Sequence, residues 1–199
     1  MFNDDTSRSQ GYQDLRTLED AIMNRLIIVC GKTNSGKSTL KNALLQHGFE
    51  SIVTYTTRSP RPGEVNDVDY HFVSEETFEN LKKEQLLEWS GYSKDGNIIQ
   101  VGSSKDSYRQ PGKHVAILDV AGLKALKESN IPYEAYYLDI PKKELIRRAR
   151  QRGTENEKQV MERLDMEEEG YKDVKLYATP LPLMSTDDLV HIVLTNDFS

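Results

Sequence analysis

The sequence predicts an α/β fold in which a parallel sheet is flanked by helices. Three apolar runs, at 26–30, 114–120 and 135–141, have the composition of buried strands, and segments with helical periodicity separate them. Apolar strands that alternate with helices are typical of parallel sheets with helices on both faces. At 199 residues, the chain is long enough for one domain with a sizeable core, with or without mobile lids.

Composition narrows the functional class. The formal net charge of -6 argues against a general nucleic-acid or membrane binder, because nucleic acids and anionic membrane surfaces both repel an acidic protein surface. The single cysteine, Cys30, ends the first strand and is expected to be a small buried apolar residue, not a catalytic thiol. The chain has no apolar run of about 18 residues and does not start like a signal peptide, so we expect a cytoplasmic protein.

The other elements can be placed along the chain. Residues 1–24 are a polar N-terminal extension, in which 15–23 either form a short helix or fray. We then expect a strand over 51–57, a helix over 74–89 capped by Ser74, strands within 91–104 joined at Asp95-Gly96, and helices over 142–153 and 155–174. The last apolar segment, 189–195, either closes the sheet or forms a helix.

Residues 31–38 follow the first strand and read GKTNSGKS, which fits the phosphate-loop pattern G-x-x-x-x-G-K-[ST]. Glycines at both ends let backbone N–H groups converge on an anion at the start of a helix. Lys37 would place a positive charge near the transferred phosphate, and the Ser38 hydroxyl could bind Mg²⁺. Asp119 ends a strand and is expected at the same sheet edge, where it could orient the metal through water.

A second anion site is suggested by 54–72. Arg58 and Arg61 lie three residues apart on a proline-stiffened turn, and arginine side chains bind phosphate bidentately. Tyr70 could add a hydroxyl. A transferase needs such a site for the phosphate of its acceptor, whereas a simple nucleotide hydrolase does not. From the chemistry alone, a solvated basic turn explains these residues equally well.

The segment TTRSPRPGEVNDVDYHF, 56–72, resembles the guanylate kinase signature T-T-R-x-P-R-x-G-E-x-x-G-x-D-Y-x-F, with Asp67 in place of the usual glycine. The likeness also covers the phosphate loop and the stretches LLEW, ILD and RQRGTE. It implies a P-loop NTPase core within 25–199, with a nucleoside-monophosphate-binding region near 54–105 and a lid near 150–170. The implied reaction is phosphoryl transfer from ATP to GMP with Mg²⁺.

The resemblance also implies roles for individual residues. Glu88 would accept hydrogen bonds from the guanine N1–H and exocyclic amine, a pair of donors that adenine lacks. The implied ATP-binding residues are Gly31, Thr33, Asn34, Ser35, Gly36, Lys37, Ser38 and Thr39. The implied GMP-binding residues are Thr54, Arg58, Arg61, Glu64, Tyr70, Glu88 and Ser103. The implied catalytic residues are Lys37, Arg58, Asp119 and the lid arginines Arg148, Arg152 and Arg163, which would stabilise the charge of the transferred group.

The acceptor pocket departs from the family pattern at two positions. The usual second aspartate is absent, because either Ala121 replaces it or two residues are deleted there. Val101 stands where a tyrosine usually precedes Gly102. Each lost hydrogen bond costs about 0.5–1.5 kcal/mol net, so we expect an elevated KM for GMP. Two alternatives remain open: a related kinase with another phosphorylated acceptor, and an inactive guanylate-kinase-like binding module. The module would have no need for Lys37 or the lid arginines.

Overall fold

The computed structural model describes residues 24–94, 97–153 and 157–198. The predicted helix over 15–23, and the polar extension apart from Asn24, lie outside the described residues. The helices and strands are, in chain order, β1 (Arg25–Cys30), α2 (Lys37–Gln46), β2 (Glu50–Ser51), β3 (Tyr55–Thr56), β4 (His71–Phe72), α3 (Glu75–Glu84), β5 (Leu86–Lys94), β6 (Asn97–Ser104), η1 (Asp106–Arg109), β7 (Lys113–Ile117), α4 (Val120–Glu128), β8 (Glu134–Leu138), α5 (Lys142–Arg152), α6 (Glu157–Gly170), η2 (Val174–Leu176), β9 (Thr179–Leu181) and α7 (Thr186–Thr195).

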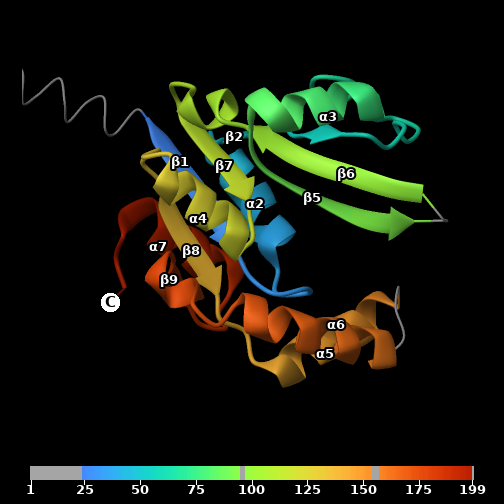
Figure 1. Cartoon of the computed structure of the whole chain (residues 1–199). Coiled ribbons are helices and arrows are strands. Elements are labelled where there is room, and N and C mark those ends of the chain that lie inside the picture. Colours follow the sequence, from blue (N-terminus) through green and yellow to red (C-terminus); the bar gives the residue numbers. More distant parts are fainter. Residues whose placement is uncertain (1–23, 95–96, 154–156, 199) are drawn as a thin grey trace, which may run out of the picture.

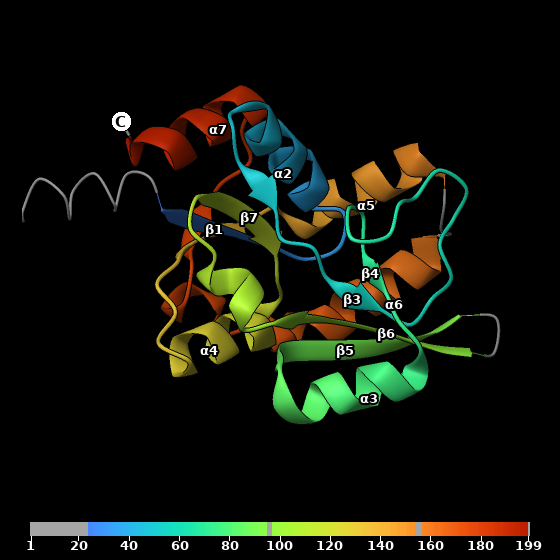
Figure 2. The same cartoon turned by 90° about the horizontal axis from the view of Figure 1, so that it is seen from above.

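The central sheet is parallel throughout and has the strand order β2-β7-β1-β8-β9. Helices α2 and α7 lie on one face of this sheet, and α4 lies on the other (Figures 1 and 2). This arrangement confirms the predicted α/β fold. Because β1 is the middle strand, the loop that follows it lies between the carboxyl ends of β7 and β8. Ligands of open α/β sheets bind at such positions.

The core has two parts because successive side chains of β1 point to opposite faces of the sheet. Ile27 and Val29 pack with the helices on one face, and Ile28 and Cys30 pack with those on the other. Cys30 is fully buried, as predicted, and burial raises the pKa of its thiol to about 12. The thiol therefore stays protonated and serves as an apolar residue.

A second sheet, of order β4-β3-β6-β5, projects from the first. The prediction of a single strand over 51–57 was wrong, because the chain passes from the central sheet to the second sheet within this segment. The Ile52 N–H donates to Val115 O of β7 in the central sheet, whereas the Thr57 N–H donates to Gln100 O of β6 in the second sheet. The predicted hairpin is present, with β5 and β6 paired antiparallel out to Lys94 and Asn97, and its turn lies outside the described residues.

Helix α3 begins where predicted and ends earlier than predicted. The Ser74 side chain accepts a hydrogen bond from the Thr77 N–H at 3.1 Å, so the expected cap is present. The helix ends at Glu84, and the LLEW segment begins strand β5. Pairing with β6 therefore overrides the helical periodicity, and it places Glu88 on a strand opposite Ser103.

The C-terminal segment resolves the alternatives left open for 189–195, which belong to helix α7 and do not form a strand. The fifth strand position is taken by β9, a three-residue edge strand that the sequence did not predict. Pro180 weakens the strand pattern of this segment and is tolerated at a sheet edge. Within the described ranges, no helix is both long enough and apolar enough to cross a lipid bilayer.

Candidate functional site

The phosphate loop joins β1 to α2, and it has a glycine at each end where a side chain would meet close neighbours. A Cβ atom on Gly31 would lie 2.6 Å from the Ser35 Oγ atom. Gly36 caps α2 with a left-handed φ of 104°, and a Cβ there would lie 3.2 Å from an Arg148 nitrogen. The two glycines therefore let Ser35 and the Arg148 guanidinium lie close to the loop backbone.

Lys37 opens helix α2, and its side chain turns back over the loop. Its Nζ atom donates to Gly31 O at 2.6 Å and to Lys32 O at 2.9 Å. Burial lowers the pKa of Lys37, Arg152 and Arg163 lower it further, and Glu167 opposes them. Ser38, the predicted metal ligand, is exposed on the first turn of α2.

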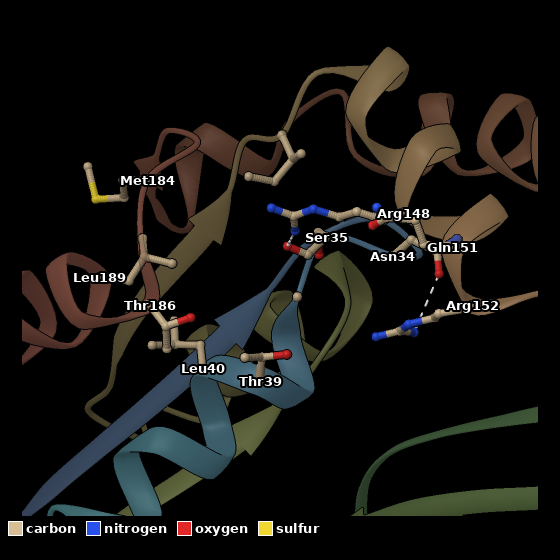
Figure 3. A pocket seen from close by; sticks show the side chains of 12 residues that line it. Asn34, Ser35, Thr39, Leu40, Arg148, Gln151, Arg152, Met184, Thr186 and Leu189 are labelled. Atoms are coloured by element: carbon tan, nitrogen blue, oxygen red, sulfur yellow. Dashed lines mark hydrogen bonds between the residues drawn. The ribbon is translucent and has the colours of Figure 1, made fainter.

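The predicted lid arginines all reach the phosphate loop. Arg148 Nη1 donates to Ser35 O at 2.7 Å, Arg152 Nη1 donates to Asn34 Oδ1 at 3.4 Å, and Arg163 Nη1 donates to Thr33 Oγ1 at 3.4 Å. Figure 3 shows Arg148 and Arg152 extending from α5 toward Ser35 and Asn34. Three guanidinium groups from α5 and α6 thus surround the place where a bound phosphate would lie.

Helix α6 and Tyr171, which follows it, make further contacts with the phosphate loop that the sequence did not predict. A Glu167 oxygen of α6 accepts a hydrogen bond from the Thr33 N–H at 2.7 Å, and Glu168 forms an ion pair with Lys32. The Tyr171 hydroxyl donates to Gly31 O at 2.8 Å. Arg163, Glu167 and Tyr171 are spaced four apart, which places them on one helical face. That spacing was the available signal, in a segment that otherwise reads as a charged helix.

A cavity of about 310 Å³ adjoins the phosphate loop on the side of α5 and α7. Asn34, Ser35 and Gly36 of the loop line it together with Arg148 and Gln151 of α5. Apolar side chains close its far side, as Figure 3 shows for Leu40, Met184 and Leu189. The cavity combines loop atoms, cations and an apolar surface, which suits a nucleotide that continues from its phosphates to a base.

A second cavity, of about 360 Å³, contains part of the predicted acceptor site. Four of the predicted GMP-binding residues line it: Thr54, Tyr70, Glu88 and Ser103. The Ser103 hydroxyl donates to Glu88 Oε1 at 2.6 Å. Burial raises the pKa of Glu88, and the hydrogen bond from Ser103 partly offsets this. A half-buried carboxylate fixed by one donor retains acceptor capacity for a ligand.

Arg58, Arg61 and Glu64 lie on the adjoining loop and do not line this cavity. Arg58 donates to both Glu64 oxygens, at 2.6 and 2.7 Å, and Glu64 also accepts from the Arg61 N–H at 2.7 Å. These hydrogen bonds lower the pKa of Glu64 to about 2. The Arg58 guanidinium lies 4.8 Å from the centre of the Tyr70 ring, so Tyr70 connects the arginine to the cavity. Glu64 therefore links the Arg58 guanidinium to the Arg61 backbone within this loop.

The departures from the family signature have different structural consequences. Asp67 adopts a left-handed φ of 65°, a conformation that glycine and aspartate tolerate better than most residues, and it contacts His71 Nδ1 at 2.6 Å. Val101 lines the acceptor cavity, whereas Ala121 is exposed on the first turn of α4 and does not line it. The position of Ala121 outside the cavity therefore does not support the expectation that this residue weakens GMP binding.

Asp119 lies at the same sheet edge as the phosphate loop, as expected, because β7 and β1 are parallel neighbours. It caps α4 by accepting from the Gly122 N–H at 2.9 Å. It also lines the acceptor cavity with Glu88, whose pKa it helps to raise. Asp69 also lines the cavity, which therefore contains three carboxylates.

Comparison with known proteins identifies the family of this chain. The guanylate kinase family profile matches residues 23–191. The guanylate kinase of Chlamydia felis is 38% identical over 149 residues, which cover 70% of this chain and 71% of that protein. The Schizosaccharomyces pombe guanylate kinase is 33% identical over 144 residues, again covering 70% and 71%.

A solved structure supports the fold independently. The crystal structure of guanylate kinase from Anaplasma phagocytophilum has a TM-score of 0.57 to this chain at 18% identity, and the match covers 89% of this chain and 88% of that one. At that identity the likeness concerns the fold alone. The family profile and the sequence relatives carry the assignment, and this chain belongs to the guanylate kinase family.

Proposed function

We propose that the protein transfers the γ-phosphoryl group of ATP to GMP, forming ADP and GDP. One structural relationship carries this proposal: the two cavities flank helix α2. Thr39 and Leu40 line the cavity beside the arginines, and the next residue, Lys41, lines the cavity that contains Glu88. The start of α2 thus lies between a site suited to the donor and a site suited to the acceptor.

At the donor site, loop N–H groups and Lys37 would hold the ATP phosphates. Arg148, Arg152 and Arg163 would stabilise the charge that spreads over the transferred group. Residues near 150–170 would act as a lid that excludes water, which otherwise competes with the acceptor.

At the acceptor site, in the region near 54–105, Glu88 would accept hydrogen bonds from two guanine donors. Ser103 fixes the orientation of this carboxylate. Arg58, oriented by Glu64, and Arg61 would bind the GMP phosphate with Tyr70. The acceptor would then be selected by its base at one end and by its charge at the other.

Mg²⁺ would accompany the nucleotide. The Ser38 hydroxyl and the Asp119 carboxylate are oxygen donors, the class of ligand that Mg²⁺ prefers, and nucleotide phosphates and water complete such a site. When bound, the ion neutralises phosphate charge. The role of Asp119 at the metal, the cytoplasmic location and the boundaries of the mobile regions are parts of the same proposal.

A panel of acceptors tests the function. ADP release by the purified protein is measured with GMP, dGMP, AMP, UMP and ribosyl phosphates under one set of conditions. The proposal expects GMP to be the best substrate. Preference for another phosphate would favour the related-kinase alternative, and no ADP release with any acceptor would favour the binding-module alternative.

A further inference from the structure

Lys41 is a cation in the acceptor cavity to which the family signature assigns no role. It lies one helical turn after Lys37 on α2, and it lines the cavity with Thr54 and Tyr70. Its Nζ atom donates to Ser51 Oγ at 3.0 Å, which is a neutral partner at the end of β2.

The charge of Lys41 is not balanced by a carboxylate. Within residues 24–94, 97–153 and 157–198, no acidic side chain lies within ion-pair distance of its Nζ atom. Three carboxylates line the cavity, and all three have other partners. Glu88 accepts from the Ser103 hydroxyl, Asp119 accepts from the Gly122 N–H, and Asp69 accepts from the Val65 N–H at 2.7 Å. Burial lowers the pKa of Lys41, so its ammonium group is partly deprived of water. An ammonium group in this state gains from a bound anion.

Position indicates which anion would bind. Residues four apart on a helix lie on the same face, so Lys37 and Lys41 extend from neighbouring turns, one at the phosphate loop and the other at the acceptor cavity. Glu88 would hold the base of the acceptor, and Tyr70, which contacts Arg58, also lines the cavity. Lys41 shares the cavity with both residues, so one acceptor can reach Glu88 with its base and Lys41 with its phosphate.

We infer that Lys41 binds the phosphate of the nucleoside monophosphate acceptor, and that it supplies a charged donor in a cavity where Val101 offers no hydroxyl. This inference rests on the proposed function. It makes Lys41 a determinant of specificity for a phosphorylated acceptor over the free nucleoside.

The test compares GMP with guanosine, which has the same base and sugar without the phosphate. Calorimetric titrations without ATP use the wild type, Lys41→Met, Lys41→Arg and a matched variant of an exposed lysine, Lys83→Met. Loss of one charged hydrogen bond in Lys41→Met should weaken GMP binding about tenfold to a hundredfold and leave guanosine binding unchanged. Lys41→Arg should restore part of the loss, and Lys83→Met should match the wild type.

Ser51→Ala separates ligand binding from a structural role. If Lys41 only ties α2 to β2, Ser51→Ala should reproduce the effect of Lys41→Met, and both variants should lower the melting temperature together. The inference is overturned by that result, by equal losses for GMP and guanosine, or by GMP binding in Lys41→Met within twofold of the wild type. If the wild type phosphorylates GMP while Lys41→Met binds it normally, this inference alone fails. If the wild type neither binds nor phosphorylates GMP, the proposed function fails with it.

Discussion

The Glu167 carboxylate of α6 accepts a hydrogen bond from the Thr33 N–H of the phosphate loop at 2.7 Å. A carboxylate of α6 thus occupies a backbone N–H donor of the kind that binds phosphate oxygens in such loops. The negative charge of Glu167 also favours the charged form of Lys37 and so raises the pKa of that lysine. ATP therefore has to compete with an internal anion.

Replacing Glu167 with glutamine should strengthen ATP binding. Glu167→Gln keeps the shape of the side chain and removes its charge, so the dissociation constant for a non-hydrolysable ATP analogue should fall about threefold to tenfold. Titration calorimetry measures the change. Glu169→Gln is the matched control, because Glu169 faces Lys172 at 3.6 Å on the exposed part of the helix. Equal or weaker binding in Glu167→Gln would show that the carboxylate does not compete with the nucleotide.

GMP binding should depend on pH through Glu88. The ionised carboxylate is the form that accepts from the two guanine donors, so affinity should be complete above the Glu88 pKa and fall as the pH drops through it. Because burial raises this pKa, the fall should begin at a higher pH than for an ordinary glutamate. GMP dissociation constants measured from neutral to acidic pH check this. Glu88→Gln should bind GMP weakly at neutral pH and lose this acidic dependence; a wild-type profile identical to that of the variant would rule Glu88 out.

The raised pKa of Glu88 also predicts an effect on stability. The folded state disfavours the ionised form, so this residue costs stability as the pH rises through its unfolded-state pKa and then its folded-state pKa. Glu88→Gln should therefore unfold at a higher urea concentration than the wild type at neutral pH, with the difference shrinking in acid. An unchanged or lower midpoint at neutral pH would contradict the burial argument.

Gly102 should be indispensable for the geometry of the acceptor site. A Cβ atom at this position would lie 2.8 Å from Glu88 O and 3.0 Å from the Trp89 Cβ atom. Gly102→Ala should push β5 away from β6, destabilise the fold by about 1–3 kcal/mol and raise the KM for GMP. Gly91→Ala is the control on the same hairpin, because its nearest contact would be an ordinary 3.6 Å. Chemical denaturation and initial rates should separate the two variants, and similar behaviour of both would contradict this explanation.

The two family departures in the acceptor region should differ in their effects. Val101 lines the cavity, so Val101→Tyr should introduce a hydroxyl there and lower the KM for GMP about fivefold, the value of one neutral hydrogen bond. Ala121 lies outside the cavity lining, so Ala121→Asp should change KM less than twofold. Steady-state rates at saturating ATP measure both effects. A larger gain from Ala121→Asp than from Val101→Tyr would favour the assignment based on the sequence pattern over the one based on position.

The sequence predicted those features of the candidate site that follow from short motifs and from the order of strands along the chain. The phosphate loop needs particular residue types at fixed spacing, and the position of Asp119 follows from the geometry of parallel strands. The pairing of Glu88 with Ser103 depends on the register of β5 and β6, which overrode a helical period that extended into LLEW. The contact of Glu167 with Thr33 joins residues 134 apart and depends on how α6 packs against the loop, which no local pattern specifies.

The most direct test of the account is the rate of GDP formation from ATP and GMP by the wild type and Lys37→Ala. The account predicts GDP as the product, and a kcat at least about a hundredfold lower in Lys37→Ala with an unchanged melting temperature, because Lys37 acts on the transferred phosphate and not in the core. Absence of GDP with the wild type, or an unchanged kcat in a folded Lys37→Ala variant, would contradict it.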